Sequence, residues 1–386
     1  MTFKFIHTAD WQIGKRFGAF DDETAARLRA ARISVIERIA HAARAHGAGH
    51  VLVAGDIFDR EDAENSVYQQ PIAKLKSFKD IIWHLIPGNH DSARSGVWEQ
   101  IVQNDPGSNV RIYLEPGAHE ITDGVALLVA PLMARTASAD PTGWMDGDDL
   151  FRSETGGGVR IGLAHGSVAD FGAEASVLID QNRAQSAKLD YLALGDWHGQ
   201  KEINSRTYYS GTPETDGWMQ NDPGYVLAVE VDGQAKSLNV EKIPVGQYVW
   251  HERKIELSGD FNPALVTDGL DELAPQPDHL LLKFRLEGLV SPEGYGQLSE
   301  LLDRLGASFG AVQRNEKRLE TRSLASDLDG LKADPTLHLT ATRLSDKIAG
   351  SSDDEKSTSQ NALKRLYAYV ARLDDGSDVV DDGGRS

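Results

Sequence analysis

Residues 51–59, VLVAGDIFD, place a fully apolar run directly before the polar block GDIFD. Such a run predicts a buried strand, and the glycine predicts a turn at its end. Four more blocks of Asp, Asn or His follow apolar runs within the first 200 residues. They are Asp10-Trp11-Gln12, Gly88-Asn89-His90-Asp91, Ala164-His165-Gly166 and Gly195-Asp196-Trp197-His198. Because polar groups collect past the carboxyl ends of strands in α/β sheets, the five blocks predict one shared site.

The elements around these blocks alternate between strand and helix patterns. Residues 3–6 open the chain as a strand, and residues 22–46 carry apolar side chains at helical spacing. A second helix is expected near residues 63–78, and uninterrupted strand patterns around residues 206–243 predict a second sheet. Residues 1–245 are therefore expected to form an α/β domain, a two-sheet α/β/β/α sandwich.

After residue 245 the pattern changes to that of a small α+β domain, expected over residues 246–340. Residues 249–257 and 279–286 have the pattern of strands. After these two strands, Ser291-Pro292-Glu293 predicts the start of a helix with Ser as N-cap and Pro at its first position. A further strand is expected after this helix.

The last segment, residues 341–386, is expected to contain a linker, one helix and an acidic tail. Residues 351–360 are polar and predict the linker. Residues 361–373 predict an amphipathic helix, whose apolar face consists of Leu363, Leu366, Tyr367, Val370 and Leu373. Two alternatives exist for this face, since it can lie in the groove of a partner protein or pack on its own domain.

Composition limits the classes of protein to which the chain can belong. Its 386 residues exceed what one core usually organises, so two or three domains are expected. The chain has no apolar run of about 18 residues and no signal-peptide layout, so we expect a cytoplasmic protein without a membrane segment. The absence of cysteine excludes thiolate sites and leaves O and N ligands, which suit Mn, Mg or Fe. A net charge of −19 argues against a free-standing, tight binder of duplex nucleic acid.

The five blocks and their neighbours resemble the calcineurin-like metallophosphoesterases. The segments that carry the resemblance are HTADWQIG, GDIFDR, PGNHD, AHG, LALGDWHG and YYSGTPE, within residues 1–245. Trp11 and the SGTPE stretch favour the SbcD-type DNA-repair nucleases over the protein phosphatases. Two positions depart from that pattern, because Gln12 and Asp196 stand where histidines are usual.

The resemblance implies two divalent metal ions, with Mn²⁺ as the first expectation and Mg²⁺ as the second. Two ions bridged by a carboxylate offset the charges of the reaction and turn a bound water into a nucleophile. Asp56 is the expected bridge. The first ion is assigned Asp10, Gln12 and His198 in addition. The second ion is assigned Asn89, His165 and Asp196 in addition.

His90 is the expected catalytic residue, because an imidazole with its ordinary pKa of about 6.5 can protonate a departing oxygen near neutral pH. Asp59 and Asp91 are expected to orient neighbouring groups rather than to bind metal. Three further histidines are expected to be structural or surface residues: His7, His50 and His84.

The function implied by the resemblance is that of a metal-dependent DNA nuclease, an exonuclease or endonuclease in DNA repair or end processing. One alternative is a phosphodiesterase or phosphatase for a small substrate. Another is a non-catalytic scaffold subunit whose metal site is weakened at Gln12 and Asp196. The expected partners are DNA, an SMC-like coiled-coil ATPase of the SbcC type and a second copy of the chain.

Overall fold

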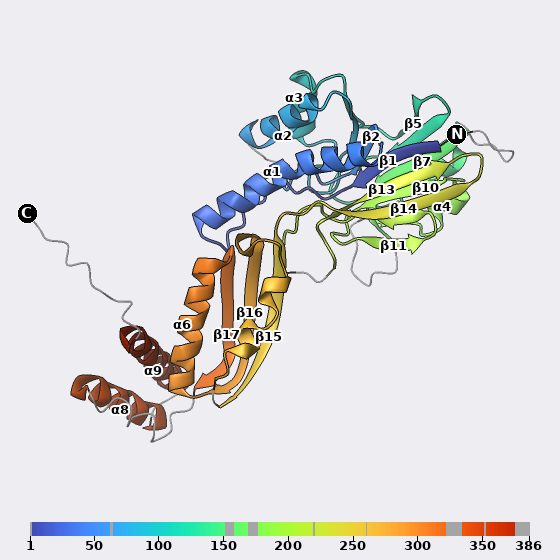
Figure 1. Cartoon of the computed structure of the whole chain (residues 1–386). Coiled ribbons are helices and arrows are strands. Elements are labelled where there is room, and N and C mark those ends of the chain that lie inside the picture. The colour runs from blue at the N-terminus through green and yellow to red at the C-terminus, as the bar shows by residue number, and fades with distance from the viewer. Residues whose placement is uncertain are drawn as a thin grey trace, which may run out of the picture. The chain divides into compact units, whose positions relative to one another are not determined.

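The computed structural model describes residues 2–61, 65–150, 158–168, 177–218, 221–259, 261–321, 334–350 and 353–374. The chain divides into two compact units, an N-terminal unit that ends at Tyr248 and a C-terminal unit that begins at Val249 (Figure 1). The acidic tail was expected from residue 374 onward, and its residues beyond 374 lie outside the described residues. Within the described parts of the chain, no helix is both long enough and apolar enough to span a bilayer.

The first sheet of the N-terminal unit has six strands in the order β14-β13-β1-β2-β3-β4. Their bounds are Thr2–Thr8 (β1), His50–Ala54 (β2), Ile82–Ile86 (β3), Val110–Ile112 (β4), Tyr225–Asp232 (β13) and Ser237–Pro244 (β14). Strands β1 to β4 are parallel, whereas β13 is antiparallel to both β1 and β14. Parallel neighbours need long crossover connections. The helices α1 (Asp22–Ala45), α2 (Asn65–Ser77) and α3 (Gly96–Gln103) provide them.

Helix α1 confirms the helix predicted over residues 22–46. Asp21 is its N-cap, and the Asp21 carboxylate accepts a hydrogen bond of 2.9 Å from the backbone N–H of Thr24. Val35, Ile36 and Ile39 are fully buried in the core that joins this helix to the outer face of the first sheet. The apolar stripe therefore fixes the helix on the sheet that carries the first three polar blocks.

The second sheet also has six strands, in the order β11-β12-β10-β7-β6-β5. Their bounds are Gly117–Thr122 (β5), Val125–Ala130 (β6), Val159–His165 (β7), Tyr191–Gly195 (β10), Lys201–Asn204 (β11) and Thr207–Tyr209 (β12). The outer face of this sheet is covered thinly, by helix α4 (Arg183–Ser186) and a 3₁₀ helix, η1 (Gly143–Gly147). A separate pair of short strands consists of β8 (Ser167–Val168) and β9 (Leu178–Ile179).

The two sheets pack face to face around one apolar core. Phe5 and Leu52 of the first sheet and Leu127, Ile161 and Tyr191 of the second are all fully buried there. Central strands covered on both faces are largely apolar, which explains the apolar runs of β2 and β10 before their polar blocks. The two-sheet α/β/β/α sandwich predicted from the sequence is confirmed.

The C-terminal unit has a sheet of three parallel strands in the order β15-β16-β17. The strands are β15 (Val249–Gly259), β16 (Leu280–Val290) and β17 (Ala311–Thr321), with helix α6 (Pro292–Ser308) between the last two. Shorter helical segments precede β16: α5 (Ala264–Thr267), η2 (Leu270–Glu272) and η3 (Pro277–His279). As predicted, Ser291 is the N-cap of α6, and its hydroxyl accepts a hydrogen bond of 3.0 Å from Gly294 N.

Two helices end the described chain, α8 (Pro335–Gly350) and α9 (Asp353–Asp374). The linker predicted over residues 351–360 is therefore wrong from residue 353 onward, and the expected boundary between residues 340 and 341 falls inside α8. Packing explains the difference, because a helix held by tertiary contacts at one end extends through polar turns at low cost.

The apolar face of α9 packs within its own unit. Leu363 and Tyr367 are buried in a cluster with Ala341 of α8, and α9 also contacts α6. Of the two alternatives for this face, the structure therefore shows the second. The side chain of Leu373 lies outside the described part of the chain.

Candidate metal centre

Five strands deliver predicted site residues at their carboxyl ends. Asp10, Asp56 and Asn89 follow β1, β2 and β3, which are neighbours in the first sheet. His165 is the last residue of β7, and Asp196 follows β10, its neighbour in the second sheet. The site therefore lies where the carboxyl ends of parallel strands from both sheets come together.

The loops that carry these residues have an unusual backbone. Asp10, Gln12, Asp56 and Asp196 have φ angles of 54°, 49°, 52° and 105°, in a region that side chains other than glycine rarely adopt. Each such residue costs on the order of 1–3 kcal/mol, and this kind of strain persists chiefly at functional sites. Close packing adds a further constraint, because a Cβ atom at Gly88 would lie 2.2 Å from Oδ1 of Asp56.

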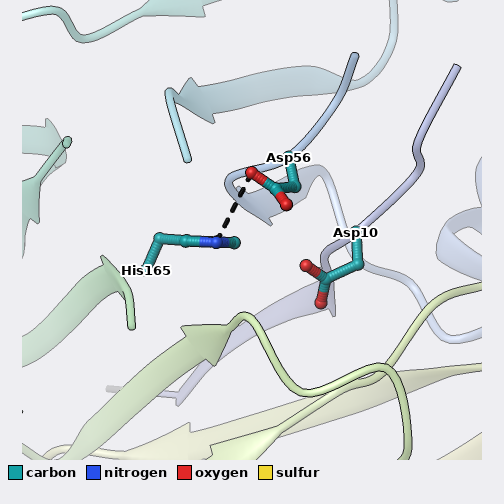
Figure 2. A group of neighbouring side chains, drawn as sticks. All are labelled: Asp10, Asp56 and His165. Atoms are coloured by element: carbon teal, nitrogen blue, oxygen red, sulfur yellow. Dashed lines mark ion pairs between the residues drawn. The ribbon is translucent and has the colours of Figure 1, made fainter. Parts of the chain in front are cut away.

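Asp10, Asp56 and His165 form the centre of the site (Figure 2). Each offers one ligand atom, and these atoms lie within 4.8 Å of one another. All three residues are buried, and Nε2 of His165 lies 3.5 Å from Oδ1 of Asp56. Two buried carboxylates and an imidazole at this spacing form a ligand set for a divalent cation.

Two buried polar atoms support metal binding independently. Nδ1 of His165 lies 2.8 Å from the carbonyl oxygen of Ala54. This nitrogen must donate its proton there, which leaves the lone pair of Nε2 for a ligand. Among the described residues, Nε2 of His165 and Oδ1 of Asn89 have no hydrogen-bond partner. Because buried polar atoms almost always have partners, two orphaned acceptors beside two aspartates fit a site for cations.

The electrostatics of the site point the same way. Burial raises the pKa of Asp10 to about 7, although His198 and His165 counteract it. Burial alone lowers the pKa of His165, but the carboxylates of Asp56, Asp10 and Asp196 outweigh this effect and raise that pKa to about 9. At neutral pH the protein alone therefore holds a proton on His165 that a bound cation must displace.

The remaining predicted ligands surround this centre. Gln12 is 1% exposed, and its Nε2 donates a hydrogen bond of 2.8 Å to Oδ2 of Asp56. The backbone N–H of Asp196 donates to the Asp10 carboxylate at 3.1 and 3.2 Å, and the Asp196 carboxylate lies 3.9 Å from Nε2 of His165. His198 is partly exposed and presents Nδ1 to a carboxylate that the sequence did not indicate, Asp216.

His90 stands at the exposed side of the site. Its Nδ1 lies 3.0 Å from the backbone carbonyl of Asp59, and its Nε2 lies 3.9 Å from Oδ2 of Asp56. Asp59 contacts His90 through its main-chain carbonyl. Asp91 orients backbone as expected, since its carboxylate accepts hydrogen bonds from Ile57, Phe58 and Gly88 at 2.9, 3.1 and 2.7 Å.

Sequence reasoning missed a group of charged residues beside His198. Asp216 lies 3.2 Å from Nδ1 of His198, 2.6 Å from Nζ of Lys15 and 3.6 Å from the Arg32 guanidinium. Burial alone raises the pKa of Asp216, but the hydrogen bond from His198 and the charge of Arg32 hold that pKa well below its usual range. The only sequence signal was proximity, because Asp216 lies just beyond the SGTPE stretch.

The chain is similar to known proteins at the level of its family. Residues 3–200 match the family model described as calcineurin-like phosphoesterase. A comparison with curated proteins finds no match. The solved structure of TT1561 from Thermus thermophilus is 11% identical, with a TM-score of 0.38 over 63% of this chain and 99% of its own. A dimetal phosphatase from Danio rerio is 13% identical, with a TM-score of 0.37 and the same two coverages of 63% and 99%.

Proposed function

The chain belongs to the calcineurin-like phosphoesterase family, and from this premise we propose that it is a metal-dependent DNA nuclease. The observation that carries the hydrolytic part is the pair of partnerless acceptors, Nε2 of His165 and Oδ1 of Asn89, beside Asp10 and Asp56. Such a pair is costly to bury unless a cation completes its coordination.

Two divalent cations fit the ligand set, and Mn²⁺ or Mg²⁺ suits its oxygen-rich chemistry. Asp56 would contribute to both ions, with Asp10 and His198 on one side and Asn89 and His165 on the other. When bound, such ions polarise the phosphoryl group and activate water. Gln12 and Asp196 would add oxygen atoms.

His90 is the residue of this chain placed to move a proton. Its Nδ1 faces the carbonyl of Asp59 and must carry a proton to donate to it. Its exposed Nε2 is then the nitrogen that can release a proton to a departing oxygen of the substrate. The His90 side chain is 46% exposed, so a substrate can approach it from solvent.

The DNA substrate is supported by the segment that distinguishes the nuclease branch. The SGTPE stretch packs directly on the last polar block, because Thr212 N donates a hydrogen bond of 3.0 Å to the carbonyl of His198. A Cβ atom at Gly211 would lie 2.7 Å from the carbonyl carbon of Gly199. Trp11, the other distinguishing residue, is 1% exposed and donates from its indole to Thr8 at 3.0 Å. Both features therefore belong to the packed interior of the site and not to its surface.

A partner complements this proposal. A chain with a net charge of −19 gains little from long-range attraction to DNA, so a partner with basic surface would help to hold the substrate. An SMC-like coiled-coil ATPase and a second copy of the chain are the partners that we propose.

The test is hydrolysis by Mn²⁺-loaded protein of linear duplex DNA, single-stranded DNA and a small chromogenic phosphodiester. We expect cleavage of DNA, and its loss in Asp56→Ala and Asn89→Ala, with the circular dichroism spectrum unchanged. Asp123→Ala, at an exposed turn, is the matched control and should cleave like wild type. Cleavage of the small diester alone would replace the nuclease by the small-substrate enzyme. Metal binding without any hydrolysis would favour the scaffold.

A further inference from the structure

Asp216 is a buried carboxylate that contacts a proposed metal ligand, His198, and two positively charged side chains. Its side chain is 5% exposed, and its two oxygens lie 3.3 and 3.2 Å from Nδ1 of His198. Oδ2 also lies 2.6 Å from Nζ of Lys15 and 3.6 Å from a guanidinium nitrogen of Arg32, whose side chain is 1% exposed. Among the described residues, Asp216 is the carboxylate that pairs with His198.

This contact determines which nitrogen of His198 can bind a metal ion. A carboxylate only accepts hydrogen bonds, so the nitrogen that faces it, Nδ1, must carry a proton. The neutral imidazole then has its lone pair on Nε2. A carboxylate behind a histidine ligand is a common means of fixing both tautomer and ring orientation in metal sites.

The positively charged side chains of Lys15 and Arg32 hold the Asp216 carboxylate in position. Arg32 donates to the backbone carbonyls of Trp11 and Glu214, so it joins the loop after β1 to the loop that carries Asp216. Lys15 extends from the same first loop to Oδ2. Both cations approach Oδ2, and Oδ1 is the oxygen that accepts the hydrogen bond of His198, although Oδ2 lies equally near Nδ1 at 3.2 Å.

We propose that Asp216 is the positioning residue of His198, and that it holds the imidazole in the Nδ1-protonated tautomer with Nε2 available to the first metal ion. The inference rests on the proposed function in one respect, the assignment of His198 as a ligand. Loss of such a carboxylate typically weakens metal binding about 10–100-fold. We expect Asp216→Ala to weaken the affinity for Mn²⁺ at one of two sites by this factor.

Asp216→Asn provides the sharper test, because it keeps the size of the side chain. Lys15 and Arg32 are donors, so they should attract the amide oxygen to the Oδ2 position and turn the amide nitrogen toward His198. The amide nitrogen would donate to Nδ1 and force the proton onto Nε2, the nitrogen that the metal needs. Asparagine should therefore weaken Mn²⁺ binding at least as much as alanine. A merely structural role predicts the opposite order, with the isosteric substitution milder.

The experiment combines calorimetric Mn²⁺ titration with nitrogen-15 chemical shifts of His198 in the metal-free protein, at an alkaline pH where the imidazole is neutral. We expect an Nδ1–H tautomer in wild type and an Nε2–H tautomer in both variants. The matched control is Asp190→Asn, a largely buried carboxylate just before the amino end of β10 that pairs with Lys236 and accepts a hydrogen bond from the backbone N–H of Arg160. This control should change neither affinity nor tautomer.

Wild-type affinity in Asp216→Asn, an unchanged tautomer in both variants, or an equal loss of affinity in Asp190→Asn would each overturn the proposal. Should Asp216→Ala not fold, the isosteric asparagine variant decides alone. Failure of the proposed function is distinguishable, because a wild type that hydrolyses no phosphoester still reports the tautomer of His198.

Discussion

Gly88→Ala should disable the site by pressing on the proposed bridging carboxylate. A Cβ atom at this position would lie 2.2 Å from Oδ1 and 2.5 Å from the backbone N of Asp56. Such contacts are essentially never shorter than 3.0 Å, so Asp56 must withdraw by about 0.8 Å. Displacements near 1 Å at a reacting centre cost on the order of 10²-fold in rate, or about 2.7 kcal/mol. Because the backbone of Asp56 is also too close, rotation of its side chain cannot relieve the contact.

The assay is turnover of a small chromogenic phosphodiester with Mn²⁺, together with calorimetric titration of the metal. We expect a loss of about 10²-fold in rate, weaker metal binding, and a destabilisation of about 1–3 kcal/mol, which is typical of overpacking. Gly143→Ala in η1 is the matched control, because a Cβ atom there would meet no atom of the described residues within 4 Å. Full activity and full metal affinity in Gly88→Ala would show that Asp56 is not held where metal binding requires it.

Three further predictions concern the catalytic acid, acid stability and the C-terminal helices. His90→Ala should retain its Mn²⁺ affinity and lose about 10²–10⁴-fold in turnover, since its proposed role is proton transfer; a tenfold loss of affinity in calorimetry would contradict this. Burial lowers the pKa of His7 to about 3, against about 6.5 in the unfolded chain, so the stability contributed by its neutral form is complete above pH 6.5 and is lost as the pH falls. At pH 5 we expect wild type to lose about 2 kcal/mol more stability than His7→Gln loses in denaturant titrations; equal losses would exclude His7 as the source. Leu363→Ala should destabilise the C-terminal unit by about 2–5 kcal/mol, whereas Tyr369→Ala, at a side chain that is 51% exposed, should change its stability by less than about 0.5 kcal/mol.

The fold of the N-terminal unit was predictable because its central strands are covered on both faces. Covered strands are largely apolar, and β2 and β10 stand out in the sequence as uninterrupted apolar runs that lead into a glycine and an aspartate. Residues 51–54 are all fully buried in β2, and Asp56 follows at once. Parallel pairing brings Asp10 and Asp56 together at the carboxyl ends of β1 and β2, and the packing of the second sheet on the first adds His165.

The group around Asp216 was not predictable in the same way. Lys15, Arg32 and Asp216 lie in a loop, a helix and a second loop, and no periodicity relates them. Their contacts depend on the left-handed backbone at Gln12 and on the approach of Gly211 to Gly199. Loop geometry of this kind is set by tertiary packing, and the sequence offers no regular pattern from which to infer it.

The linker prediction failed for a related reason. Residues 353–360 are polar, and a polar run without periodicity predicts a loop when it is considered alone. The run nevertheless begins a helix, because later residues of α9, Leu363 and Tyr367, pack on α8. Once the apolar end of a helix is fixed, each further polar residue adds one hydrogen bond without a new nucleation cost.

The two departures from the family pattern alter the chemistry of the site without removing contacts that hold it. At position 196 the backbone N–H, which any residue except proline supplies, holds the Asp10 carboxylate. At position 12 an imidazole is replaced by an amide, which offers a donor and an acceptor at once. Nε2 of Gln12 already donates a hydrogen bond to Asp56, so its Oε1 remains available to bind a cation. A histidine that bound a cation through one ring nitrogen could contact Asp56 only through its other ring nitrogen. We therefore expect Gln12 to orient the bridging carboxylate and to bind the first ion weakly. Gln12→His should therefore raise the affinity for that ion, and the variant should lose the hydrogen bond that fixes Asp56.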